Sequence, residues 1–295
     1  MRFQRRCVAC TVLVFAMAML SAYCAGQTSS QPATKQVATF PFLEQWKAAV
    51  ISGNIATLQA LYSSNPPAQV ATAAGASSVT SEIAFWTGLK GRRVKLSVVQ
   101  ADSPQEGVER LFLQAEFLTR TGPGGETLYA TEGQLWQMQG GQWRIIGTKR
   151  SATTKLQQPA SISKVIYAPG VDGHAEIKRA LELAAKGHKR VLVVFGANWC
   201  YYCHVLDLAF QRPDIVGVLQ QSFEVVHVDV GEGDKNQDLM QEYQVPMKRG
   251  IPAIAVLDSS GKLLYSQKGG EFERARALAP EDVLQFLNKW KAAAR

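Results

Sequence analysis

Residues 193–204 have the sequence Val-Val-Phe-Gly-Ala-Asn-Trp-Cys-Tyr-Tyr-Cys-His, and this stretch decides the fold of the second half of the chain. It begins inside the apolar run Arg190–Phe195, which is typical of a buried central strand, and continues into a helical pattern. A thiol at such a corner, where a strand ends and a helix begins, lies next to unpaired backbone N–H groups and the positive end of the helix dipole, and both favour the thiolate. The pattern therefore predicts Cys200 as a nucleophile and Cys203, one turn further, as the thiol that resolves a mixed disulfide.

The segments around this corner predict an α/β domain over residues 171–295. Asp172 can cap a helix that Gly187 ends, and Pro280 can open a final helix with one apolar face. The remaining elements are a strand over 223–230 and a hairpin of two strands, 253–257 and 263–267. The order is helix, strand, helix, strand, hairpin, helix.

Residues 170–295 resemble the thioredoxin-fold family, in its exported bacterial form. Trp199-Cys200-x-x-Cys203 matches the active-site motif of that family, and Gly250-Ile251-Pro252-Ala253 matches its cis-proline loop. The resemblance implies a central mixed sheet flanked by helices and a redox-active disulfide that needs no other cofactor. It also implies that substrate contacts come from the residues beside the cysteines and the cis-proline, which are Trp199, Tyr201, Tyr202, Ile251 and Pro252.

The sequence departs from the family pattern behind the second cysteine. Val194 stands where the family commonly has a buried acid, and Val225 stands where it has a lysine. The residues between the cysteines are Tyr-Tyr and not Gly-Pro, so no reduction potential can be transferred from thioredoxin. His204 and Arg249, the latter next to Lys248, are candidate modulators of the thiols.

Cys200-x-x-Cys203-His204 also fits the attachment pattern of a c-type haem, in which His204 would bind the iron. The apolar strand, Trp199 and the cis-proline loop are not explained by haem attachment and favour the thioredoxin interpretation. A zinc site would need a second CxxC or an HxxxH, and the sequence after residue 26 has neither. We therefore predict no metal.

Residues 1–26 have the pattern of a secretory signal peptide, with a basic start, an apolar middle and small residues at the end. Three of the five cysteines, Cys7, Cys10 and Cys24, lie in it. The prediction is an exported protein, periplasmic or otherwise extracytoplasmic. We expect it to be soluble and not lipid-anchored, because Tyr23 precedes Cys24 where a lipidation signal needs a small residue. Residues 27–37 form a polar spacer.

The segment 38–150 shows helical spacing first and then, from Arg92, the alternation of antiparallel strands separated by glycine-rich turns. It resembles the nuclear-transport-factor-2-like cone fold, an α+β domain with a bent antiparallel sheet. The resemblance rests on that architecture and on the pattern Trp46…Gly53…Leu58…Leu61-Tyr62. This fold has many functions and therefore assigns none. Residues 151–170, rich in Ser, Thr, Gln and Pro, are predicted to link the two domains.

Charge and composition limit the classes of partner that the protein is expected to bind. Removing the signal peptide removes three arginines and lowers the formal net charge of +8, and no basic run is present, so nucleic-acid binding is not expected. The predicted function is an exported thiol–disulfide oxidoreductase with protein substrates and an upstream electron donor or acceptor, for which a membrane-bound protein is one candidate. The alternative is a binding or assembly protein whose cone domain recognises a ligand or dimerises, with low redox turnover. The sequence leaves open the redox direction, the substrate, the oligomeric state and the signal cleavage site.

Overall fold

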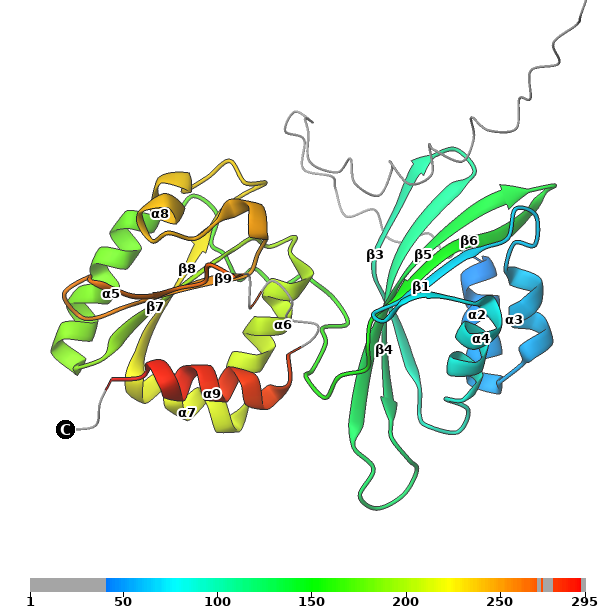
Figure 1. Cartoon of the computed structure of the whole chain (residues 1–295), viewed down its shortest axis with the longest axis horizontal. Coiled ribbons are helices and arrows are strands. Elements are labelled where there is room, and N and C mark those ends of the chain that lie inside the picture. The colour runs from blue at the N-terminus through cyan, green and yellow to red at the C-terminus, as the bar shows by residue number, and fades with distance from the viewer. Residues whose placement is uncertain (1–40, 270–271, 273–277, 293–295) are drawn as a thin grey trace, which may run out of the picture. The chain divides into compact units, whose positions relative to one another are not determined.

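The computed structural model describes residues 41–269, 272 and 278–292 (Figure 1). The predicted signal peptide and polar spacer lie outside the described residues. The described chain forms an N-terminal α+β domain, from α2 to β6, and a C-terminal α/β domain, from α5 to α9. Within the described ranges, every helix is too short or too polar to cross a membrane.

Three helices pack on the sheet of the N-terminal domain. They are α2 (Pro41–Ser52), α3 (Ile55–Leu61) and α4 (Val79–Thr87). Gly53 has a φ of 71° and ends α2 in a left-handed conformation that suits glycine. Asn54 then caps α3 by accepting a hydrogen bond from the Thr57 N–H at 3.0 Å.

The N-terminal sheet has six strands in the order β2-β1-β6-β5-β4-β3. All neighbours are antiparallel except β1 and β6, which are parallel. The bounds are β1 (Gln69–Thr72), β2 (Gly75–Ser77), β3 (Lys95–Gln105), β4 (Val108–Leu118), β5 (Thr127–Gln139) and β6 (Gln142–Arg150). Register shifts along β3 and within the β5–β6 pair accompany the bend of the sheet.

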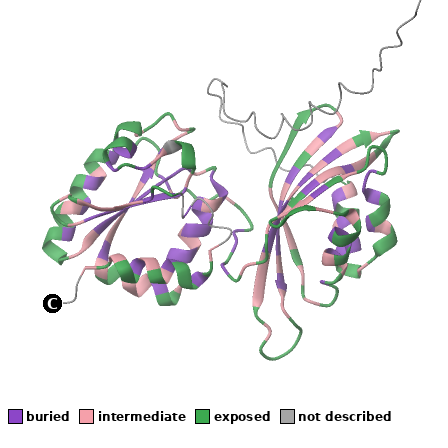
Figure 2. Cartoon of the chain, in the orientation of Figure 1, coloured by how far each residue is buried: buried purple, intermediate pink, exposed green. Residues whose placement is uncertain are grey.

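Tryptophan side chains form the centre of the N-terminal core. Trp46, Trp86 and Trp136 are at most 1% exposed, and the rings of Trp46 and Trp86 meet edge to face at 5.0 Å. Figure 2 shows buried residues on the helices and along the strands of this domain. The predicted α+β architecture with a bent antiparallel sheet is confirmed.

The C-terminal sheet has four strands in the order β10-β9-β7-β8. β7 is parallel to β8 and antiparallel to β9, so the sheet is mixed, as predicted. The strand bounds are β7 (Arg190–Gly196), β8 (Phe223–Asp229), β9 (Ala253–Leu257) and β10 (Leu263–Ser266). Residues 191–195 of β7 are at most 1% exposed, which is what the continuous apolar run predicts for a central strand.

Helices cover both faces of this sheet. Alternate residues of β7 point to two separate cores: Val191, Val193 and Phe195 to one, Leu192 and Val194 to the other. The first core includes α5 (Gly173–Gly187) and α8 (Gln237–Glu242). The second includes α6 (Tyr201–Phe210), α7 (Pro213–Ser222) and α9 (Pro280–Trp290). Figure 1 shows these two layers on either side of β7 and β9.

Part of the predicted linker packs against the C-terminal domain. Leu156 is 1% exposed and joins the core beneath α6 and α9, and Tyr167 is also 1% exposed. The carbonyl of Pro159 accepts a hydrogen bond from the Tyr201 hydroxyl at 3.2 Å. Composition predicted a segment that links the two domains, and these few buried side chains hold it against the second of them.

Candidate active site

The two cysteines lie where β7 gives way to α6. Cys200 is the N-cap of α6, and a disulfide joins it to Cys203 in the first turn of the helix. The Cys203 N–H donates to the Cys200 sulfur at 3.2 Å, so that sulfur occupies the place of a capping oxygen. A thiolate at Cys200 would receive this N–H and the positive end of the helix dipole.

The Ile251–Pro252 segment brings a second stretch of chain to the disulfide. The peptide bond between the two residues is cis, and the Ile251 carbonyl oxygen lies 3.7 Å from the Cys200 sulfur. Pro252 is buried immediately before β9, whereas Ile251 is half-buried and packs against the cysteines. The two motifs singled out in the sequence therefore meet at one place.

The aromatic residues beside the cysteines differ in exposure. Trp199 is 47% exposed, and its Nε1 donates to the Gly231 carbonyl at 3.0 Å, which holds the ring at the surface next to Cys200. Tyr202 is half-buried against the disulfide, whereas Tyr201 is buried. Of the five predicted substrate-contact residues, Trp199, Tyr202 and Ile251 are therefore the ones that a partner can reach. The role of each of the five residues remains a prediction.

The two candidate modulators occupy different environments. His204 is 3% exposed, and its Nε2 donates to the Asn198 carbonyl at 2.8 Å, since a carbonyl oxygen can only accept. This bond ties the first turn of α6 to the loop before Cys200. Arg249 and Lys248 are exposed on the 3₁₀ turn Met247–Arg249. Among the residues described, no three His, Cys, Asp or Glu side chains gather as metal ligands.

Asn198 clamps the upstream segment to the active-site loop, a role that the sequence analysis missed. Its Oδ1 accepts from the N–H groups of Ile166 and Tyr167 at 2.8 and 2.9 Å. Its Nδ2 donates to the Tyr167 carbonyl at 2.7 Å. One side chain therefore fixes the backbone of Tyr167 on both sides.

Tyr167 lies directly behind the disulfide, and the sequence analysis missed this residue too. It packs in one apolar cluster with Cys200 and Cys203. Its ring also meets the His227 ring edge to face at 5.5 Å. Burial raises the pKa of the Tyr167 phenol above its usual range, and the negative charges of Asp207 and Asp229 add to this. No local pattern signals this residue, because it lies in a stretch of linker composition.

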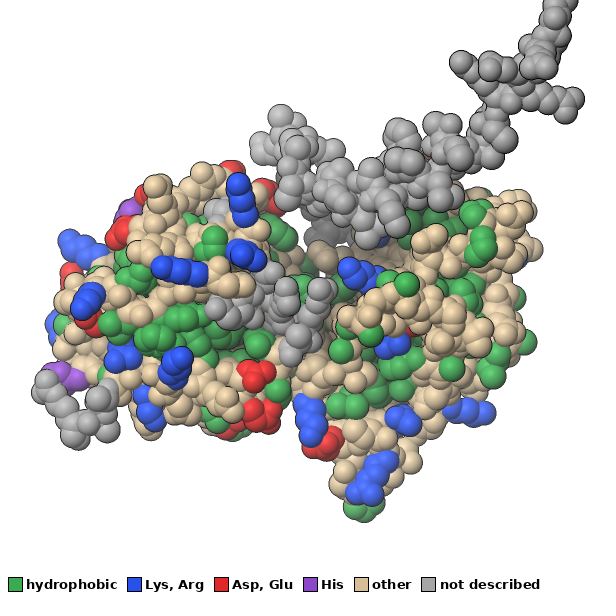
Figure 3. All heavy atoms as spheres, viewed as in Figure 1, with side chains coloured by type: hydrophobic (Ala, Val, Ile, Leu, Met, Phe, Trp, Pro, Cys, Tyr) green, Lys and Arg blue, Asp and Glu red, His purple; other side chains and the backbone are tan. Residues whose placement is uncertain are grey.

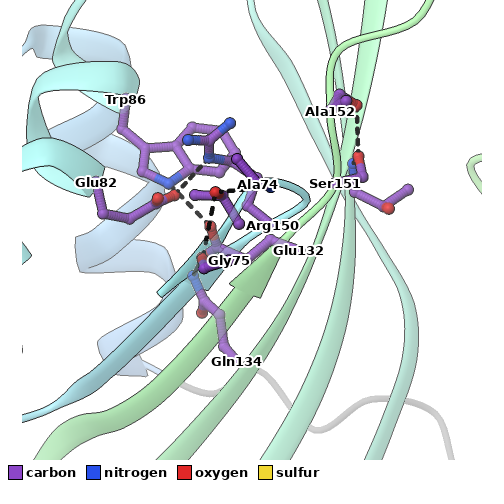
Figure 4. A network of polar contacts seen from close by, with 11 residues as sticks. Ala74, Gly75, Glu82, Trp86, Glu132, Gln134, Arg150, Ser151 and Ala152 are labelled. Atoms are coloured by element: carbon purple, nitrogen blue, oxygen red, sulfur yellow. Dashed lines mark hydrogen bonds and ion pairs between the residues drawn. The ribbon is translucent and has the colours of Figure 1, made fainter. Parts of the chain in front are cut away.

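A buried polar network lies in the N-terminal domain (Figure 4). Glu82 of α4 and Glu132 of β5 are both fully buried. Glu132 accepts from Trp86 Nε1 at 3.0 Å and from Gln134 Nε2 at 2.7 Å. Arg150, at the end of β6, donates from Nε to Glu82 at 2.7 Å. The network joins α4 to two strands of the sheet.

The buried carboxyl of Glu132 holds a proton more tightly than an exposed carboxyl does. Burial raises the pKa of Glu132 well above its ordinary value of 4.5, and the negative charge of Glu82 raises it further. Glu82 Oε2 has no donor among the described residues, and a proton between the two carboxyls would supply one. One proton and the Arg150 guanidinium together neutralise the pair.

Comparisons with known proteins agree with the architecture. A family model described as thioredoxin-like matches residues 172–259. The chain is similar to the thiol:disulfide interchange protein DsbD 2 of Pseudomonas aeruginosa, with 29% identity over 153 residues. That match covers 51% of this chain and 24% of the relative, so most of the relative's length has no counterpart here.

Two solved structures each cover one part of the chain. A disulphide isomerase from Xylella fastidiosa Temecula1 is 38% identical, and the match covers 43% of this chain and 97% of that one, with a TM-score of 0.41. An NTF2-like protein of unknown function in nutrient uptake, from Rhodospirillum rubrum, is 17% identical. That match covers 38% of this chain and 94% of the other, with a TM-score of 0.32.

The family match confirms the resemblance that the two motifs predicted for the second half of the chain. The N-terminal domain has the helix-and-bent-sheet architecture of the nuclear-transport-factor-2-like fold. The C-terminal domain of this chain is thioredoxin-like, and its paired cysteines are Cys200 and Cys203.

Proposed function

We propose that the chain is a thiol–disulfide oxidoreductase that exchanges disulfides with protein substrates through Cys200 and Cys203. One observation carries the proposal: the Cys200 sulfur caps α6 and faces the Ile251 carbonyl, with the exposed Trp199 ring beside it. A backbone carbonyl next to a reactive sulfur offers a hydrogen-bond partner to an extended substrate peptide. The names of the relatives point to the same chemistry.

The exchange follows from the position of the two sulfurs. In the reduced protein, the Cys200 thiolate attacks a substrate disulfide, one substrate sulfur leaves as a thiolate, and a mixed disulfide forms. Cys203 then loses its proton to solvent and attacks the Cys200 sulfur, and the second substrate sulfur leaves and is protonated. The substrate gains two electrons, and the protein ends with the Cys200–Cys203 disulfide. The reverse sequence oxidises a substrate dithiol.

The partners and the compartment belong to the same proposal. Each turnover leaves the cysteine pair in the wrong redox state for the next, so a second protein must supply or remove two electrons. The signal-like residues 1–26 support export, where structural disulfides form and persist. The disulfide itself is the redox group, and no further cofactor is part of the proposed reaction.

The test is reduction of insulin disulfides by the chain without residues 1–26, with dithiothreitol as the electron source. Cys200→Ser should abolish the acceleration over dithiothreitol alone. Cys203→Ser should retain the first attack and accumulate a mixed disulfide with insulin, visible on a non-reducing gel. Insulin reduction by Cys200→Ser at the wild-type rate would refute the proposal.

The redox direction is a separate measurement. Thiol alkylation across glutathione or dithiothreitol buffers gives the reduction potential of the pair. A value near about −270 mV would make the protein an electron donor, and a value near about −120 mV would make it an oxidant.

A further inference from the structure

We propose that the Tyr167 phenol donates a hydrogen bond to the Cys203 thiolate and stabilises it at a place where position 194 offers no acid. The proposal deepens the proposed function, because it assigns a group to the step in which Cys203 attacks or leaves. It rests on four features: the place of Tyr167 behind the disulfide, its fixed backbone, the apolar residue at 194 and the protonated state of the phenol.

The phenol and the second cysteine meet at Gly196, the last residue of β7. A Cβ atom built on Gly196 would overlap the Tyr167 hydroxyl and lie 2.8 Å from the Cys203 sulfur. The two groups therefore flank the same point of the backbone, with no side chain between them. Glycine at 196 is required for this approach, because any larger residue would push the tyrosine and the sulfur apart.

The position of the phenol is fixed before any reaction. Asn198 holds the Tyr167 backbone by two hydrogen bonds and the Ile166 N–H by a third, and its own carbonyl accepts from His204 of α6. Ile166 is clamped by the same amide and packs against the cysteine cluster. A donor held in this way loses little conformational entropy when the thiolate forms.

The charged groups around the phenol keep it protonated. Asp207 of α6 and Asp229 of β8 disfavour a phenolate, and burial disfavours it more strongly. His227 of β8 faces the ring, and burial lowers its pKa, so it is neutral near pH 7. The nearby cations are paired with these carboxylates, Lys164 with Asp207 and Lys235 with Asp229. A phenol that stays protonated can donate to a thiolate but cannot act as its base.

Tyr167 keeps its hydroxyl proton throughout the step in which Cys203 attacks or leaves. When the mixed disulfide resolves, Cys203 gives its proton to solvent, and the thiolate receives the Tyr167 O–H bond before it attacks the Cys200 sulfur. In the reverse direction, the bond between the two cysteines breaks and Cys203 leaves as a thiolate that the same O–H stabilises. Stabilising that thiolate lowers the pKa of Cys203 and increases its reactive fraction near neutral pH.

The experiment measures the ionisation of Cys203 and needs no turnover. In a Cys200→Ser background, thiolate absorbance near 240 nm is followed against pH, with and without Tyr167→Phe. Phenylalanine keeps the ring packing and removes only the hydroxyl. We expect the pKa of Cys203 to rise by about one unit, which is a tenfold loss in the ionisation constant. Site-specific 3,5-difluorotyrosine at position 167 is a stronger donor and should shift the pKa in the opposite direction.

Tyr243→Phe is the matched control, because Tyr243 is a buried tyrosine packed in the core on the other face of the sheet. It should leave the pKa of Cys203 unchanged. An unchanged pKa in Tyr167→Phe, an equal shift in Tyr243→Phe, or shifts of one sign for phenylalanine and difluorotyrosine would each overturn the proposal. Failure of insulin reduction would instead refute the proposed function, and the titration would still stand.

Discussion

Replacing Glu132 by glutamine should remove a pH dependence from the stability of the N-terminal domain. Glu132 is fully buried, and both burial and Glu82 raise its pKa above 4.5. The folded protein therefore binds this proton more tightly than the unfolded chain does. The resulting stability is complete below the ordinary pKa and is lost as the pH rises through the raised one.

The magnitude follows from one proton. Over each pH unit in which the folded chain keeps the proton and the unfolded chain does not, the free energy of unfolding falls by about 1.4 kcal/mol. Glu132→Gln has no such proton, and its amide can still donate to Glu82. It loses one of the two acceptors that serve Trp86 and Gln134, at a cost of about 1 kcal/mol. The variant should therefore be less stable than the wild type near pH 4.5 and more stable near pH 7.5.

The assay is urea unfolding of the full chain at about pH 4.5, 6.0 and 7.5, followed by tryptophan fluorescence. Trp46, Trp86, Trp136 and Trp143 all lie in the N-terminal domain and report on it. Glu116→Gln is the control, because Glu116 forms a partly exposed pair with Lys95 and should keep the wild-type slope. Equal slopes for the wild type and Glu132→Gln would show that the buried pair does not hold a proton.

Two further predictions concern the active site. Gly196→Ala should destabilise the C-terminal domain by about 3 kcal/mol or more, because its methyl group would overlap Tyr167 and crowd Cys203. Gly217→Ala in α7 should stabilise the domain by about 0.5–1 kcal/mol, because its methyl group meets nothing within 4 Å. Urea unfolding of the two variants measures both changes. Trp199→Ala should leave the unfolding transition in place but raise the KM for insulin several-fold, since the ring is 47% exposed beside Cys200; an unchanged KM would remove Trp199 from the substrate surface.

The active-site corner could be predicted because its determinants are local. An apolar run long enough for a buried strand, a cysteine in the capping position and a helical pattern after it lie within fifteen residues of each other. The partner loop at Pro252 was found through a family motif and not through periodicity. Both signals depend on residue type at a fixed spacing, which a single sequence displays directly.

Tyr167 and the Glu82–Glu132 pair could not be predicted, because long-range contacts define them. Composition assigns residues 151–170 to a linker, and only the hydrogen bonds of Asn198 show that Tyr167 is held. In β5, the buried face carries Glu132 and Gln134, whereas the alternation rule places polar residues in solvent. The compensating donors are Trp86 of α4, 46 residues from Glu132, and Arg150 of β6, 68 residues from its acceptor Glu82.

The packing of residues 156–167 changes where the C-terminal domain begins as a folding unit. The family match starts at residue 172, yet Leu156 fills its core and Tyr167 backs its disulfide. A protein cut at residue 172 would keep both cysteines and the proline loop. It would expose apolar surface beneath α6 and leave an empty space behind Cys203. The smallest autonomous version of this domain therefore starts upstream of Leu156.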